Sequence, residues 1–140
     1  MNKENFISAA NAVSADVAPQ VLVADDELSI RLLVEDILEQ AGYRVELAEN
    51  GRDALHHVSQ SPPDLVITDI FMPDMDGTEL IRALSKSNPG LPILAMSGGR
   101  SETKTHLRIA QALGARDLID KPFDIHMLLQ SVANCLSEHR

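Results

Sequence analysis

The sequence predicts an α/β protein in which helices cover both faces of a parallel β-sheet. Short apolar runs, typical of strands buried on both faces, alternate with segments whose apolar residues recur at helical spacing. Several apolar runs end in a polar side chain that is followed by turn-forming residues. Strand–helix–strand crossovers are right-handed and place helices on both faces of a sheet. With 140 residues, the chain has room for one domain with one core.

Composition argues against several classes of protein. The net charge is −9, no basic cluster occurs and aromatic residues make up only 3%, so no nucleic-acid surface is expected. No apolar run approaches the roughly 18 residues of a transmembrane helix, so no membrane span is expected. The single cysteine, Cys135, excludes an internal disulfide framework and favours a reducing, cytoplasmic location.

The first residues differ in composition from the rest. Residues 1–18 are rich in Ala, Ser, Asn and Val and are predicted to be a disordered leader. A weakly helical docking segment is the alternative, because apolar residues recur there at Phe6, Ile7, Ala10 and Val13. Residues 19–140 are predicted to form a single domain with no output domain after it.

Two strand–helix units are predicted in the first half of the chain. The apolar run at 21–24 is the first strand, and apolar residues at helical spacing predict a helix at 29–41, capped by a glycine. Alternating apolar residues at 43–47 predict the second strand. A turn at 50–51 then leads into a short helix, which two prolines end at 62–63.

Three further strand–helix units are predicted in the second half. Each strand is a short apolar run, and each helix has apolar residues on one face and a capping or breaking residue at an end. In the last helix, Met127, Leu128, Val132 and Leu136 are expected to face inward. The predicted strands are residues 65–67, 92–96 and 117–119, and the predicted helices begin at Thr78, near Glu102 and at Asp124.

These five units predict a flavodoxin-like, three-layer, doubly wound fold with five helices and a five-stranded parallel sheet. The expected strand order is 2-1-3-4-5, which is not visible in the sequence itself. We favour it because it brings the carboxyl ends of strands one, three, four and five together where the strand order reverses.

Asp69 is predicted to lie at the carboxyl end of the third strand, where open α/β sheets bind ligands. Asp25 and Asp26 follow the first strand, Ser97 the fourth and Lys121 the fifth. Because these ends lie on one edge of a parallel sheet, their carboxylates, hydroxyl and ammonium are expected to converge. Each residue alone has an ordinary explanation as a cap, a turn or a surface residue, but their order and placement together favour a site.

The expected convergence has a specific chemistry. Carboxylates within a few Å repel one another, and a hard divalent cation such as Mg²⁺ relieves the repulsion while leaving positions open for phosphoryl oxygens. A carboxylate can also attack phosphorus and form an aspartyl-phosphate. Lys121 would offer a charge and Ser97 a hydroxyl to the phosphoryl oxygens, while Gly98 and Gly99 would let backbone N–H groups approach an anion.

Four motifs occur in order along the chain and are highly specific together. They are LVADDE at 22–27, DLVITD at 64–69 followed by Met72-Pro73 and Asp76-Gly77, AMSG at 95–98, and KPF at 121–123. With these motifs, the chain over about residues 20–138 resembles the receiver domain of two-component response regulators, of the chemotaxis-regulator type.

The resemblance implies a role for each matching residue. Asp69 would accept a phosphoryl group from a phosphohistidine on a sensor histidine kinase or a histidine phosphotransfer protein. Asp26 would ligate Mg²⁺ or Mn²⁺ directly, with Asp25 acting directly or through water and the backbone carbonyl of Phe71 as a further ligand. Ser97 and Lys121 would hold the phosphoryl oxygens.

The resemblance also implies a cis bond between Lys121 and Pro122. The phosphorylated domain would signal through contacts with a downstream protein target. Enzymatic activity beyond the phosphorylation and autodephosphorylation of Asp69 is not expected. The sequence leaves the cognate kinase, the target and the oligomeric state open.

Two positions depart from the family pattern. Leu118 stands where the family often has Tyr or Phe, so a large aromatic swing is excluded as the readout and a shift of Ser97 is the expected switch. Phe71, two residues after Asp69, is bulky and apolar, and is expected to shield a phosphoryl group from water.

Two alternatives stand beside this function. The first is a binding module that keeps the receiver fold but takes no phosphate. The second is an aspartate-nucleophile phosphohydrolase of the haloacid dehalogenase type, which is disfavoured because Phe71 stands where that family has an acid.

Overall fold

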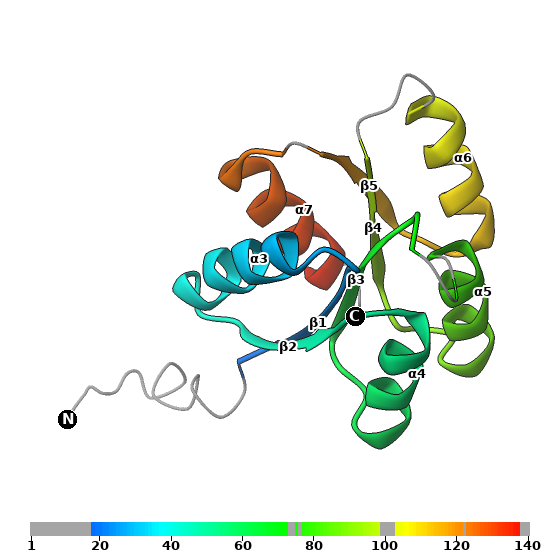
Figure 1. Ribbon diagram of the computed structural model, residues 1–140, viewed down its shortest axis with the longest axis horizontal. Helices are drawn as coiled ribbons and strands as arrows, with labels where there is room; N and C mark the ends of the chain where they lie inside the picture. The colour runs from blue at the N-terminus through cyan, green and yellow to red at the C-terminus, as the bar shows by residue number, and fades with distance from the viewer. Residues whose placement is uncertain (1–17, 73–74, 76, 99–102, 122, 138–140) are drawn as a thin grey trace.

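The computed structural model describes residues 18–72, 75, 77–98, 103–121 and 123–137. Within these residues, five parallel strands form one sheet in the order β2-β1-β3-β4-β5, and five helices connect or follow them (Figure 1). The predicted fold class and strand order are therefore confirmed. The elements are β1 Gln20–Ala24, α3 Leu28–Gln40, β2 Arg44–Ala48, α4 Gly51–Gln60, β3 Leu65–Asp69, α5 Gly77–Ser87, β4 Ile93–Ser97, α6 Thr103–Leu113, β5 Asp117–Asp120 and α7 Ile125–Ser137.

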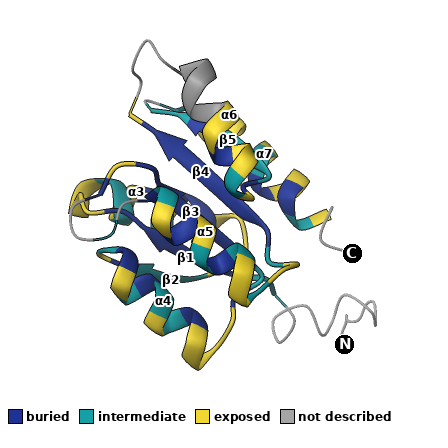
Figure 2. Cartoon of the chain, turned by 90° about the vertical axis from the view of Figure 1, so that its right-hand side faces the viewer, coloured by how far each residue is buried: buried dark blue, intermediate teal, exposed yellow. Residues whose placement is uncertain are grey.

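The helices form two layers around the sheet. Helices α3 and α7 cover one face, and α4, α5 and α6 cover the other (Figure 1). Side chains alternate along each strand: Val21 and Val23 of β1 pack in the cluster of α3 and α7, whereas Leu22 packs in the cluster of α4, α5 and α6. The strands β1, β3 and β4 are buried along their length, while the helices turn exposed residues outward (Figure 2).

Local signals explain most helix ends. The Asn50 side chain accepts a hydrogen bond from the Asp53 amide at 2.8 Å, so Asn50 caps α4 rather than only turning the chain. Asp124 caps α7 in the same way, accepting from the Met127 amide at 2.7 Å. Gly42 follows α3 with a φ of 100°, the left-handed conformation predicted for its C-terminal glycine. Helix α5 begins at Gly77, one residue before Thr78, so Thr78 lies inside the first turn and does not precede the helix as its cap.

One residue predicted to face the core is exposed. Met127 has 52% of its surface exposed, and the buried residues of α7 are Leu128, Val132 and Cys135. The buried face follows the spacing of four and three residues that begins at Leu128, and Met127 lies about 100° away from it around the helix. Leu136 is partly buried against the same cluster, and Cys135 is one of its buried residues.

Several predictions fall outside the described residues. These are the leader, apart from Ala18, the turn residues Pro73 and Asp76, the loop residue Gly99 and the bond to Pro122. The extent of the domain over 19–140 also stays a prediction. None of the helices in the described part of the chain is long and apolar enough to cross a bilayer.

Candidate functional site

Hydrogen bonds at the carboxyl edge of the sheet hold the predicted site residues in register. The Ile70 amide donates to the Met96 carbonyl at 2.9 Å, and the Lys121 amide donates to the Ser97 carbonyl at 2.7 Å. The parallel ladder therefore continues just beyond β3 and β5. Asp69 and Ser97, the last residues of β3 and β4, are fixed by backbone pairing rather than by loops.

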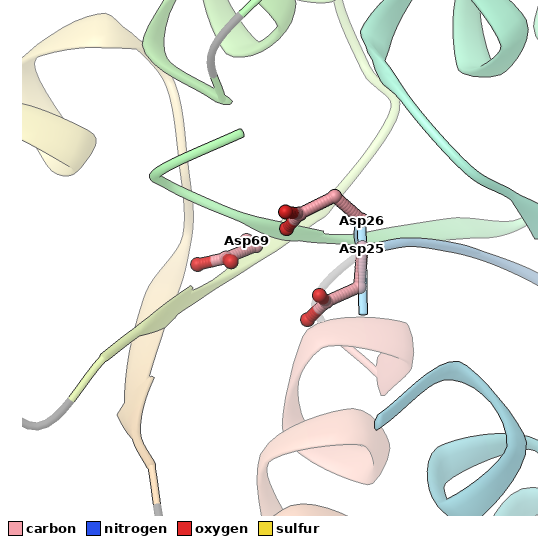
Figure 3. Close-up of side chains that lie close together, drawn as sticks. All are labelled: Asp25, Asp26 and Asp69. Atoms are coloured by element: carbon pink, nitrogen blue, oxygen red, sulfur yellow. The ribbon is translucent and has the colours of Figure 1, made fainter. Parts of the chain in front are cut away.

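Three carboxylates meet at this edge. One oxygen from each of Asp25, Asp26 and Asp69 lies within 4.8 Å of the other two. Figure 3 shows the three side chains side by side at the ends of β1 and β3. Asp25 is fully buried and Asp69 is 6% exposed, whereas Asp26 is exposed, so the cluster has a buried floor and an open side.

Lys121 bridges two of these carboxylates. Its Nζ lies 2.8 Å from Asp25 Oδ2 and 3.3 Å from Asp69 Oδ2, and the side chain is only 12% exposed. Glu27 Oε1 lies 3.8 Å from the same ammonium on the solvent side. The predicted convergence of the carboxylates and the lysine is therefore what the structure shows. The ammonium compensates part of the negative charge, and none of these three contacts involves Asp26.

Burial is the largest influence on the pKa of the Asp69 carboxyl. It raises the pKa of the Asp69 carboxyl, and the Asp25 carboxylate raises it further, while Lys121 and the Phe71 amide oppose the increase. Burial alone lowers the pKa of Lys121, but hydrogen bonds and charges from Asp25 and Asp69 outweigh it and raise that pKa overall. Lys121 therefore stays a cation in this site, and the negative charge of Asp69 is disfavoured relative to an exposed carboxylate.

Two groups that the sequence did not single out hold the loop after β1. Arg31 Nη1 donates to the Asp25 carbonyl at 2.6 Å, and the Glu27 amide donates to Asp25 Oδ1 at 2.9 Å. A signal for Arg31 does exist in the sequence. The helix dipole makes a positive charge unfavourable in the first turn of a helix. An arginine at that position therefore suggests a nearby hydrogen-bond acceptor that compensates the cost.

Gly77, seen in the sequence only as a turn residue, also shapes the site. A Cβ at this position would collide with the Asp69 carbonyl oxygen and with Cα of Ile70. The Gly77 amide donates to the Ile70 carbonyl at 2.8 Å. The first turn of α5 therefore packs directly against the backbone of the predicted acceptor, at a distance that only glycine permits.

The remaining predicted residues lie around this cluster. Ser97 is fully buried at the end of β4, and Gly98 follows it at the surface, where an added Cβ would meet nothing within 4 Å. Leu118 lies in β5 opposite Ala95 and packs, partly buried, against the core. Phe71 is 51% exposed, and its amide is 3.4 Å from Asp69 Oδ1. The roles predicted for these four residues stay predictions.

The donor set suits a divalent cation. Carboxylate oxygens are the ligands that Mg²⁺ prefers, and an open side lets such an ion keep water or take a substrate oxygen. The buried Asp25 and Asp69 and the exposed Asp26 provide that combination. Asp25, Asp26 and Asp69 are therefore the described residues that would hold Mg²⁺ or Mn²⁺.

A doubly wound sheet with acidic residues and a lysine at its switch point defines a receiver-type α/β domain. The family model of the response regulator receiver domain matches residues 21–133, and the chain belongs to this family.

Known proteins of this kind are similar over most of the chain. The DNA-binding transcriptional regulator NtrC of Bradyrhizobium sp. is 38% identical over 121 residues, which cover 86% of this chain and 25% of that protein. The response regulator MprA of Mycolicibacterium vanbaalenii is 38% identical over 111 residues, covering 79% and 47%. The structure of the Vibrio cholerae chemotaxis protein CheY4 matches with a TM-score of 0.78 and 35% identity, covering 85% and 99%. The chain thus spans a quarter to about half the length of these two curated relatives.

Proposed function

We propose that Asp69 accepts a phosphoryl group from a phosphohistidine in a reaction that depends on Mg²⁺ or Mn²⁺. The observation that carries this proposal is the meeting of Asp25, Asp26 and Asp69 within 4.8 Å, with Lys121 between two of them. The family to which the chain belongs supports the same chemistry.

The residues divide the chemistry among them. An Asp69 carboxylate oxygen would form the bond to phosphorus while the phosphorus–nitrogen bond of the donor breaks and its electron pair returns to the imidazole. Lys121, whose Nζ lies 3.3 Å from Asp69 Oδ2, would bind one phosphoryl oxygen, and the Ser97 hydroxyl would bind another. A divalent cation held by Asp25, Asp26, Asp69 and the Phe71 carbonyl would neutralise part of the phosphoryl charge.

The partners follow from this chemistry. The donor would be a sensor histidine kinase or a histidine phosphotransfer protein, and the output would be a contact with a downstream protein. Exposed apolar side chains close to the site residues, at Leu28 and Phe71, support docking of a protein donor. Phosphorylation would add about −1.5 to −2 charges at the edge of the sheet and bias the surface beside it. Beyond this self-phosphorylation and its reversal, we propose no enzymatic activity.

Incubation with acetyl phosphate and Mg²⁺, followed by intact mass measurement, tests the proposal. A single phosphoryl addition is expected, and it should be absent in Asp69→Ala and when the metal is chelated. Asp36→Ala is the matched control, because Asp36 is exposed on α3 away from the cluster, and it should be phosphorylated like the native chain. Absence of phosphorylation in the native chain would instead favour a binding module that takes no phosphate.

A further inference from the structure

An apolar groove lies between α3 and α7, on the face of the sheet that these two helices cover. Its walls are formed by Leu33 and Ile37 of α3, by Ala41 at the C-terminal end of that helix, and by Ile125 and Leu129 of α7. Leu33 belongs to the apolar spacing that predicts this helix, and it is 48% exposed at the groove. Exposed apolar side chains that line a hollow together mark a binding surface more often than isolated ones do.

The groove suits side chains of a polypeptide. Its volume is about 280 Å³. That lies just below the roughly 300–1,000 Å³ typical of small-molecule pockets. Asp36 and Gln40 are the polar residues in its lining, and they hydrogen-bond to each other at 3.0 Å. Apolar walls with few convergent polar groups fit the apolar face of an amphipathic helix.

The start of the described chain lies beside one end of this groove. The Ala18 carbonyl accepts a hydrogen bond from Arg44 Nε at 3.0 Å, and the Pro19 carbonyl accepts from the Arg44 amide at 3.0 Å. Arg44 begins β2 only three residues after Ala41, which lines the groove. The described chain therefore begins at residues bonded to Arg44, and a segment that precedes Ala18 would start close to the Ala41 end of the groove.

The length and the pattern of this segment match the groove. Phe6, Ile7, Ala10 and Val13 would form one face of a helix and extend over about 10 Å along its axis. The lining residues of α3, from Leu33 to Ala41, extend over about 12 Å. Residues 14–17 would bridge at most about 14 Å, enough to reach from Ala18 to the Ala41 end.

We propose that residues 6–13 dock as a helix in the groove between α3 and α7 of the same chain. Val13 would lie toward Ala41, and Phe6 and Ile7 would lie toward Leu33 and Ile125. The segment would then cover apolar surface on α3 that is otherwise exposed to solvent. This inference does not depend on the phosphorylation of Asp69.

Paramagnetic relaxation in the full chain tests the docking. A nitroxide at Ser8→Cys points away from the apolar face of the segment, and the native Cys135 is buried. The amide signals of Leu33, Ile37, Ala41 and Ile125 should lose intensity selectively. A second groove, lined by Leu55, Val58 and Leu84 between α4 and α5, serves as the reference surface and should keep its signals.

Two matched pairs of variants sharpen the test. Phe6→Ser with Ile7→Ser should abolish the selective loss, whereas Ala12→Ser with Ala15→Ser, on the other side of the segment, should preserve it. Leu33→Ser should release the segment, whereas Leu32→Ser should not, because Leu32 is equally exposed at 48% but does not line the groove. These are solvent-exposed positions of α3, so both variants are expected to fold.

Three outcomes would overturn the proposal. One is the absence of selective intensity loss at the groove. Another is a loss at the second groove instead. The third comes from mixing isotope-labelled chains that carry no nitroxide with unlabelled chains that carry it. If the groove amides of the isotope-labelled chains lose signal intensity in this mixture, the occupant is the segment of a second copy.

Discussion

Lys121 Nζ lies 2.8 Å from Asp25 Oδ2 but 3.3 Å from Asp69 Oδ2. The ammonium is thus anchored on the fully buried carboxylate of Asp25 and reaches Asp69 at the longer of the two distances. Charge compensation is therefore unequal. This agrees with the raised pKa of Asp69, for which burial outweighs the effect of Lys121.

Removing the ammonium should destabilise the fold. Lys121→Met leaves the buried Asp25 carboxylate without this cation, and loss of one partner of a buried pair costs about 3 kcal/mol or more. We expect a fall of about that size in the free energy of unfolding, measured by urea denaturation in a metal chelator. Lys86→Met, at an exposed position of α5, is the control and should change the free energy by less than about 0.5 kcal/mol. Equal effects of the two substitutions would contradict the bridging role.

Neutralising Asp69 should stabilise the protein when divalent cations are absent. The folded-state pKa of Asp69 is raised above its ordinary value of 3.8, so the folded chain holds this proton more tightly than the unfolded chain does. The contribution of Asp69 to stability is therefore greatest below pH 3.8 and is lost as the pH rises through the raised pKa.

Asp69→Asn removes the ionisable carboxyl, and with it the loss of stability that accompanies its ionisation. The variant should gain stability relative to the native chain as the pH rises from acid to neutral, measured by urea denaturation across that range in a chelator. Glu39→Gln, at an exposed position of α3, should show no such trend. A native chain that is at least as stable as Asp69→Asn at neutral pH would contradict this prediction.

The sequence predicts the sheet edge well because strand ends are a local property. An apolar run followed by a polar residue locates Asp25, Asp69 and Ser97, and the parallel topology brings them together. The preference of Mg²⁺ for oxygen ligands then predicts the use of the carboxylates. The convergence of these side chains therefore follows from residue type and order along the chain, together with the parallel strand order.

What the sequence misses depends on contacts between elements. The bond from Arg31 to the Asp25 carbonyl joins a helix to a loop, and the approach of Gly77 to the Asp69 backbone is set by how α5 packs on the sheet. The exposure of Met127 and Leu33 is set by which side of each helix meets the sheet, and an apolar residue at the margin of that side fits either environment. The spacing of apolar residues alone does not show whether a residue at the edge of the apolar face is buried or exposed.

Arg31 should support cation binding without touching the ion. Its guanidinium fixes the carbonyl of Asp25 at 2.6 Å, and loss of such a supporting contact typically weakens a metal site by about tenfold or more. Arg31→Ala is therefore expected to weaken Mg²⁺ binding by about tenfold, measured by calorimetric titration. Arg82→Ala, at an exposed position of α5, is the control. Unchanged affinity in Arg31→Ala would mean that the loop holds its shape without this bond.

Gly77 should tolerate no side chain. In Gly77→Ala the new Cβ would collide with the Asp69 carbonyl, so α5 or the end of β3 must shift. Overpacking of this kind costs about 1–3 kcal/mol, and we expect a loss in that range by thermal or urea unfolding. The site should lose phosphorylation by acetyl phosphate as well, because the acceptor backbone moves. Gly90→Ala is the matched control, since a Cβ there meets nothing within 4 Å, and it should leave both readouts unchanged.

Phe71 should prolong the lifetime of the phosphoryl group. It follows Asp69 by two residues, its amide lies 3.4 Å from Asp69 Oδ1 and it is 51% exposed, so a bulky apolar residue stands at the surface beside Asp69. Phe71→Asn replaces this apolar cover with a polar side chain that can orient water, and the aspartyl-phosphate should decay faster. The decay of the intact mass of the phosphorylated chain measures the rate after acetyl phosphate is removed. Phe71→Leu keeps an apolar cover and should decay at close to the native rate. If Phe71→Asn decays no faster than Phe71→Leu, water is excluded by other groups and Phe71 has no shielding role.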